Sequence, residues 1–178
     1  MFVDESGLLM APLVRRSWSL RGHTPVLRQR TRSHQKVSAI AAVCISPRRD
    51  RVSLYFRLHP DANVNTACVM DFLEHLQRQL RCPIVLLWDR FQAHLGQLIQ
   101  QCVPSGSAHL EYLPAYAPEL NPVEYLWAYL KTNPLANDPA LDLISLAARA
   151  RRAARSVQHQ PALLLGFLRH SGLSLRLK

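Results

Sequence analysis

Three acidic residues are candidates for catalysis and metal binding. Asp4 lies in the short segment FVDESG, Asp89 ends the apolar run PIVLLWD, and Glu124 lies in LNPVEYLWAYLK. Carboxylates from separate segments repel one another where they meet, unless divalent cations such as Mg²⁺ or Mn²⁺, which accept oxygen ligands, neutralise them. Two such ions about 3.5 to 4 Å apart activate a water or 3′-hydroxyl and stabilise the leaving oxygen of a phosphodiester. The three acids therefore predict metal-dependent phosphoryl transfer, with each of them a catalytic residue and a metal ligand.

Each acid also has a structural interpretation. Residues 121–124 have the spacing of a helix N-cap, a proline at the first helical position and a capping-box acid, so the Glu124 carboxylate is able to accept from the Asn121 N–H. Asp4 fits a turn, and Asp89 fits a cap of the helix expected after it. Each acid taken singly favours the structural interpretation, whereas the three together favour a site.

The remaining features of these segments are interpreted as structural. Glu5, Glu111 and Glu119 are expected to be solvent-facing or turn acids, and Trp127 is expected to lie in the core of its helix rather than stack on a nucleobase.

The elements that must position the acids follow from the spacing of apolar residues. In chain order they are strands at 2–4, 37–46 and 52–58, a helix at 63–81, a strand at 84–88, a helix at 95–102, a strand at 109–113 and helices at 122–131, 141–158 and 161–170. This order, β-β-β-α-β-α-β-α with additional C-terminal helices, predicts an α/β fold with a mixed central sheet. We expect one domain over residues 1–178, with a helical C-terminal extension from about 141 to 178.

The strand expected at 84–88 explains the position of Asp89. An uninterrupted apolar run is typical of a strand covered on both faces. Ligands reach such a sheet at the ends of its strands, where a polar side chain is accessible while the run stays packed. Asp89 is therefore expected at an edge of the sheet that a ligand can reach.

The charge of the chain indicates a polyanionic partner. The formal net charge is +10, and two segments, 15–49 and 143–178, carry nine and seven basic residues with no acid. Such segments are typical of a surface that binds nucleic acid, although an arginine-rich chain also places guanidinium groups on an ordinary surface. The candidates for contact with DNA phosphates are Arg15, Arg16, Arg28, Arg30, Arg32, Lys36, Arg151, Arg152 and Arg155.

The composition also limits location and redox chemistry. No run approaches the roughly 18 apolar residues of a membrane span, and the first residues do not look like a signal peptide, so we expect a cytoplasmic protein with no membrane partner. The four cysteines form no Cys-x-x-Cys pair and no zinc-like group, which predicts reduced, mostly buried thiols.

Three segments, FVDESG, LLWDRFQAH and YLPAYAPELNPVEYLWAYLK, resemble the three motifs of DDE transposases of the mariner-like superfamily, bacterial insertion-sequence branch. The 34 residues between Asp89 and Glu124 match the interval of that superfamily. The resemblance implies a ribonuclease H-like fold, a metal-binding triad of Asp4, Asp89 and Glu124, and two Mg²⁺ or Mn²⁺ ions. It also implies cleavage of transposon ends, transfer of the 3′-hydroxyl into target DNA, typically at TA, and a homodimer on double-stranded DNA.

The resemblance adds candidates that line the site. The family places a histidine near the position of His94, although a neutral histidine facing a helix core is the alternative. Asn121 is a second candidate. Arg90 is a third and departs from the family, where asparagine is common, so its cation either holds a phosphate or weakens metal binding.

A larger departure concerns the N-terminus, since relatives carry a helix-turn-helix DNA-binding region before the first acid. We expect this region to be absent here, supplied by an upstream reading frame or lost in a truncated remnant. Only three residues precede Asp4, so its strand is expected to be frayed and the chain to be a poor enzyme by itself. The alternatives are a non-catalytic remnant that binds DNA or modulates an intact transposase, and a stand-alone nuclease.

Overall fold

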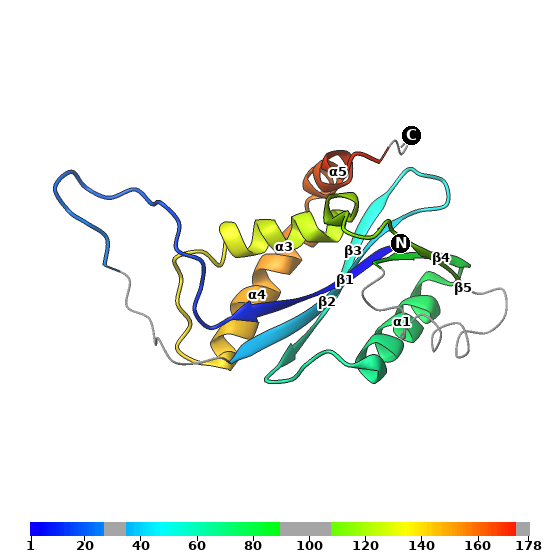
Figure 1. Ribbon diagram of the computed structural model, residues 1–178, viewed down its shortest axis with the longest axis horizontal. Helices are drawn as coiled ribbons and strands as arrows, with labels where there is room; N and C mark the ends of the chain where they lie inside the picture. Colours follow the sequence, from blue (N-terminus) through cyan, green and yellow to red (C-terminus); the bar gives the residue numbers. More distant parts are fainter. Residues whose placement is uncertain (27–34, 90–107, 174–178) are drawn as a thin grey trace.

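The computed structural model describes residues 1–26, 35–89 and 108–173. The helix expected at 95–102 lies outside these residues. The described elements are β1 (Phe2–Leu9), β2 (Lys36–Ile45), β3 (Val52–Pro60), α1 (Thr66–Leu80), β4 (Ile84–Trp88), β5 (Ala108–Tyr112), the 3₁₀ helix η2 (Pro118–Leu120), α3 (Pro122–Thr132), α4 (Leu143–Gln158) and α5 (Pro161–His170) (Figure 1). Their order agrees with the order expected from the sequence.

The five described strands form one mixed sheet in the order β3-β2-β1-β4-β5. β1, β2 and β3 are antiparallel neighbours, whereas β4 runs parallel to β1 and β5 runs parallel to β4. Phe2 of β1 pairs with Leu87 of β4. Two residues further along both parallel strands, Asp4 is level with Asp89, so the sheet itself brings these two acids to the same height.

Strand β1 is longer than the sequence analysis expected. It spans eight residues, and each of them pairs with β2, from Phe2 opposite Val43 to Leu9 opposite Lys36. Leu8 continues the buried positions of the strand beyond Ser6 and Gly7. The expectation of a frayed strand is therefore wrong, because Asp4 lies inside a fully paired strand, opposite Ala41.

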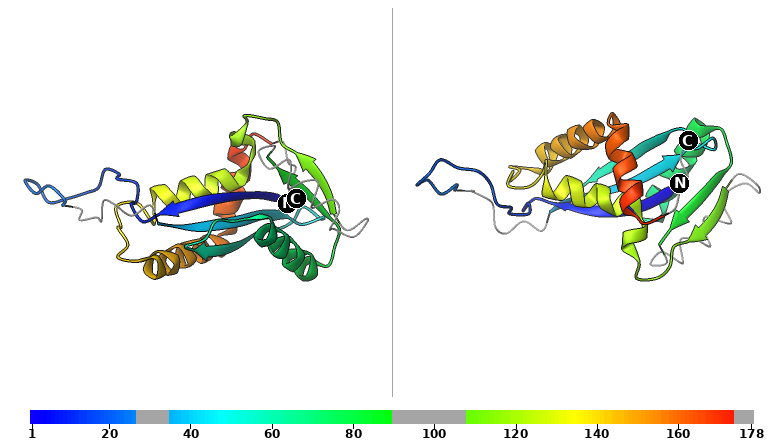
Figure 2. Two further views of the ribbon diagram at one scale, coloured as in Figure 1. Left: turned by 60° about the horizontal axis from the view of Figure 1, so that its bottom comes forward. Right: turned by 90° about the horizontal axis from the view of Figure 1, so that it is seen from above.

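Helices cover both faces of the sheet, as the side chains of β2 show. The odd-numbered residues from Val37 to Val43 pack in a core with α3, α4 and α5, whereas Ile40 and Ala42 pack in a second core with α1. Figure 2 shows α3 and α1 on opposite sides of the sheet. None of the described helices is long and apolar enough to cross a membrane.

The first part of the connection between β1 and β2, residues 11–26, projects away from the body of the molecule (Figure 1). This part is almost entirely exposed. Asn137 fixes its base, since the Asn137 side chain accepts from the Arg15 N–H at 2.7 Å and donates to the Arg15 carbonyl at 2.8 Å. We call residues 11–26 the arm.

Candidate active site

Asp4 is a buried carboxyl in the centre of β1, with 6% of its surface exposed. Its Oδ2 accepts a hydrogen bond from the indole Nε1 of Trp127 in α3 at 2.8 Å. Burial, together with the negative charges of Glu124, Glu5 and Asp89, raises the pKa of Asp4 to about 8, although the Trp127 hydrogen bond lowers it. A turn acid would be solvated, so the turn interpretation of Asp4 is wrong.

Glu124 lies in the first turn of α3, and its carboxylate does not cap the helix. The Asn121 side chain caps α3 by accepting from the Val123 N–H at 3.1 Å, while the Asn121 N–H donates to the Pro118 carbonyl at 2.9 Å. The capping-box interpretation of Glu124 is therefore wrong. Partial burial raises the pKa of Glu124, an effect that the cation of Lys131 opposes and the charge of Asp89 increases.

Glu5 belongs to the same group of acids, although the sequence analysis interpreted it as a solvent or turn acid. Its Oε1 is buried and has no hydrogen-bond partner in the described part of the chain. Burial, followed by the charge of Asp89, raises the pKa of Glu5 to about 7. Neighbouring residues of a strand point to opposite faces, so Asp4 and Glu5 flank β1 on its two sides. We call Asp4, Glu5, Asp89 and Glu124 the acid cluster.

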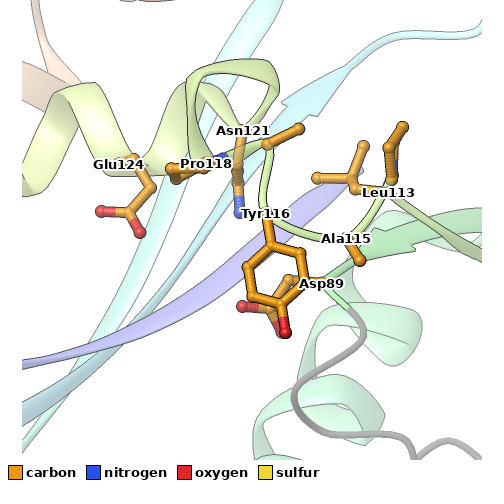
Figure 3. Close-up of a pocket in the computed structure, with 9 residues that line it drawn as sticks. Asp89, Leu113, Ala115, Tyr116, Pro118, Asn121 and Glu124 are labelled. Carbon is orange, nitrogen blue, oxygen red and sulfur yellow. The ribbon is translucent and has the colours of Figure 1, made fainter.

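Two of these acids line a pocket of about 390 Å³ at the end of β4 and β5 (Figure 3). Asp89 lies on one side and Glu124 on the other, and the segment 113–118 completes the wall together with Asn121. The Asn121 Nδ2 also donates to the Val3 carbonyl at 3.3 Å. Asn121 thus lines the pocket, caps α3 and links the start of that helix to the strand that carries Asp4.

The acids of the cluster interact electrostatically, but their side chains do not form a complete set of metal ligands. Within residues 1–26, 35–89 and 108–173, no three His, Cys, Asp or Glu side chains are placed to hold one ion. One oxygen of Asp4 accepts a hydrogen bond from the Trp127 indole instead. The donors are all carboxylate oxygens, which suit Mg²⁺ or Mn²⁺, and the raised pKa values and the buried Oε1 of Glu5 mark a place that a cation would stabilise.

The basic residues are spread over separate surfaces. Arg15 and Arg16 lie on the exposed arm, and Lys36 is half-buried at the start of β2. The three candidates on α4 are exposed, and α4 packs on β3, the strand at the far edge of the sheet from β5. The other candidates, Arg28, Arg30, Arg32, Arg90 and His94, lie outside the described residues.

Trp127 is buried, as expected from the sequence, and in addition it positions Asp4. We predict that Trp127→Phe, which keeps most of the apolar contact and removes the indole N–H, lowers the free energy of unfolding by about 1 to 3 kcal/mol. Chemical denaturation at pH 7 measures this. Trp18→Phe is the matched control, because Trp18 is 99% exposed on the arm and its replacement should change stability by less than about 0.5 kcal/mol. Equal effects of the two substitutions would contradict the prediction.

A mixed sheet of this order, covered by helices on both faces, is the ribonuclease H-like catalytic fold. A family profile described as "DDE superfamily endonuclease" matches residues 1–147, and the chain belongs to this family. No curated protein matches the sequence.

Solved structures of the Mos1 mariner transposase share the fold. The Mos1 paired end complex with Mn is 18% identical with a TM-score of 0.59, and the Mos1 strand transfer complex is 19% identical with a TM-score of 0.57. A pre-cleavage Mos1 transpososome is 18% identical with a TM-score of 0.58. In all three cases the match covers 98% of this chain and 56% of the Mos1 chain, so this chain spans little more than half of that protein.

Proposed function

We propose that this chain is the catalytic domain of a DNA transposase, which cleaves transposon ends and transfers the freed 3′-hydroxyl into target DNA. One observation carries the proposal: Asp4 from β1, Asp89 after β4 and Glu124 from α3 act on one another electrostatically beside one pocket. Membership of the endonuclease family and the likeness to Mos1 complexes in fold support it.

The residues that would hold two divalent ions are Asp4, Asp89 and Glu124. A Mos1 paired end complex with Mg and another with Mn support Mg²⁺ or Mn²⁺ as the ion. Bound there, the ions would activate the attacking oxygen and stabilise the leaving oxygen. The chain itself keeps the acids in place, since Trp127 holds an oxygen of Asp4 and Asn121 fixes the start of α3.

The partner in this proposal is double-stranded DNA, both transposon ends and target. The Mos1 relatives are paired-end and strand-transfer complexes, which supports a homodimer on DNA as the working form. A helix-turn-helix region would recognise the transposon end, either elsewhere in a longer chain or on a protein encoded upstream. The site of action would be the bacterial cytoplasm, at the nucleoid.

The test is metal-dependent cleavage of supercoiled plasmid DNA. Purified chain is incubated with Mg²⁺ or Mn²⁺, and nicked circles are expected in both, with none in excess EDTA. A folded chain that binds the plasmid and never nicks it in either metal would contradict the proposal. That result would favour the non-catalytic, DNA-binding alternative.

DNA binding by this chain is expected to be largely independent of sequence and steeply dependent on salt. Arg151, Arg152 and Arg155 are exposed and make no ion pair within the described residues. Each arginine bound to a phosphate releases counterions, so replacing all three with glutamine should flatten the slope of log K against log salt by about 2 to 3. Titration of labelled duplex at several salt concentrations measures the slope.

The control for that titration is Arg78→Gln, because Arg78 is exposed but pairs with Glu74 in α1. Its slope should stay close to that of the unmodified chain. Binding that does not respond to salt, or an unchanged slope in the triple variant, would show that α4 does not contact DNA phosphates.

A further inference from the structure

Tyr116 has an aromatic side chain that does not pack into the described part of the chain. It is fully exposed, and it lines the pocket between Asp89 and Glu124 (Figure 3). The ring makes no hydrogen bond and no ring contact within the described residues. Apolar surface displayed on the wall of a pocket is unfavourable in water and becomes favourable where a ligand covers it.

The backbone of Tyr116 is strained as well. Its φ is 58°, in the left-handed region that residues other than glycine rarely adopt and that aromatic side chains adopt at an energetic cost. Because the ring is exposed, burial against adjoining residues does not offset this cost. Strain at an exposed aromatic residue in a pocket is typical of a residue held ready for a ligand.

The loop that carries Tyr116 is fastened at both ends to the strands that carry the aspartates. The Leu113 N–H donates to the Trp88 carbonyl at 2.7 Å, immediately before Asp89. At the other end, the Asn121 side chain donates to the Val3 carbonyl at 3.3 Å, immediately before Asp4. The prolines at 114 and 118 restrict the chain between these anchors. The position of Tyr116 is therefore fixed relative to the acid cluster.

A DNA strand in this pocket needs contacts beyond the acid cluster. The ions of the proposed function would hold the phosphodiester and make no contact with the bases beside it, so contacts with those bases must come from other groups of the chain. Aromatic rings provide this by stacking on bases with little regard to sequence, since every base has a π-face. In a fully paired duplex the faces of internal bases are covered by their neighbours, so an exposed ring on a pocket wall suits an unpaired base.

We propose that Tyr116 stacks on an unpaired nucleobase next to the phosphodiester that occupies the acid cluster. The inference rests on the proposed function, because it takes DNA as the ligand of this pocket. The recognised element is a base freed from its pair, in single-stranded DNA or at an opened duplex end, and the contact is independent of which base it is.

Photocrosslinking tests the contact. The full chain is mixed, in Mg²⁺, with a single-stranded oligonucleotide carrying 5-iodouracil, and the crosslinked peptide is identified by mass spectrometry. We expect a crosslink at Tyr116 with the single strand and none there when the same uracil is paired inside a duplex. Tyr116→Phe should keep the crosslink at that position, and Tyr116→Leu should lose it and lower single-strand affinity about tenfold.

The control is Tyr112→Leu, since Tyr112 is 37% exposed on β5 and does not line this pocket. Crosslinks only at other residues, or equal single-strand affinity of Tyr116→Leu and the unmodified chain, would overturn the inference. A Tyr116 crosslink in a chain that never nicks plasmid would leave the stacking contact standing and defeat the proposed function. Nicking of plasmid without any crosslink at Tyr116 would support the proposed function and overturn the stacking contact.

Discussion

Replacing Asp4 with asparagine is expected to raise the free energy of unfolding of the metal-free chain at pH 9 by several kcal/mol. The pKa of Asp4 is about 8 in the folded chain and about 3.9 in an unfolded one, so the folded state binds more protons between these values. The stability that this proton provides is complete below about pH 4 and is lost as the pH rises through 8. Four pH units correspond to about 5 kcal/mol, an upper bound because Asp4 shares its shift with neighbouring acids.

Asparagine removes the charge and keeps an oxygen that accepts from the Trp127 indole. Urea denaturation at pH 5, 7 and 9 in EDTA should therefore show a stability that falls with pH in the unmodified chain and falls much less in Asp4→Asn. Asp61→Asn is the control, because Asp61 is exposed and does not line the pocket. Identical pH dependence of stability in Asp4→Asn and the unmodified chain would show that folding does not raise the pKa of the Asp4 carboxyl.

Much of the site follows from local rules that act within a few residues. The run before Asp89 predicted a strand that ends in an acid, and β4 ends at Trp88. The Asn-Pro pair at 121–122 predicted the start of α3, and the side chain of Asn121 caps that helix. Such features depend on backbone geometry and apolar spacing, which the sequence displays directly.

The features that the sequence did not predict depend on contacts between distant segments. The Trp127 to Asp4 hydrogen bond joins residues 123 positions apart, and no spacing rule links them. Glu5 seemed ordinary because acids beside a Ser-Gly pair are common in turns, yet pairing of β1 with β2 extends past that pair and buries part of Glu5. The only signal for Glu5 was its place next to Asp4, on the other face of the same strand.

Neutralising one acid of the proposed triad is expected to reduce plasmid cleavage by about a thousandfold or more. Asp89→Asn and Glu124→Gln keep the size of each side chain and remove the charge that would hold a divalent ion. Charge stabilisation of the transition state by bound ions is worth several kcal/mol, and each 1.36 kcal/mol corresponds to about tenfold in rate. Because the triad would act as a unit, the double variant should be little worse than either single variant.

The controls for these rates are acids of the same type outside the cluster. Glu119→Gln removes a charge from η2, five residues before Glu124, and Glu111→Gln removes one from β5; both should nick plasmid at close to the unmodified rate. Glu5→Gln separates the triad from the wider cluster, because Glu5 shares its electrostatic environment with Asp89 without lining the pocket. A smaller loss for Glu5→Gln than for Glu124→Gln would assign Glu5 to tuning the charge around the ions. Cleavage by Glu124→Gln within about threefold of the unmodified chain would remove Glu124 from the triad.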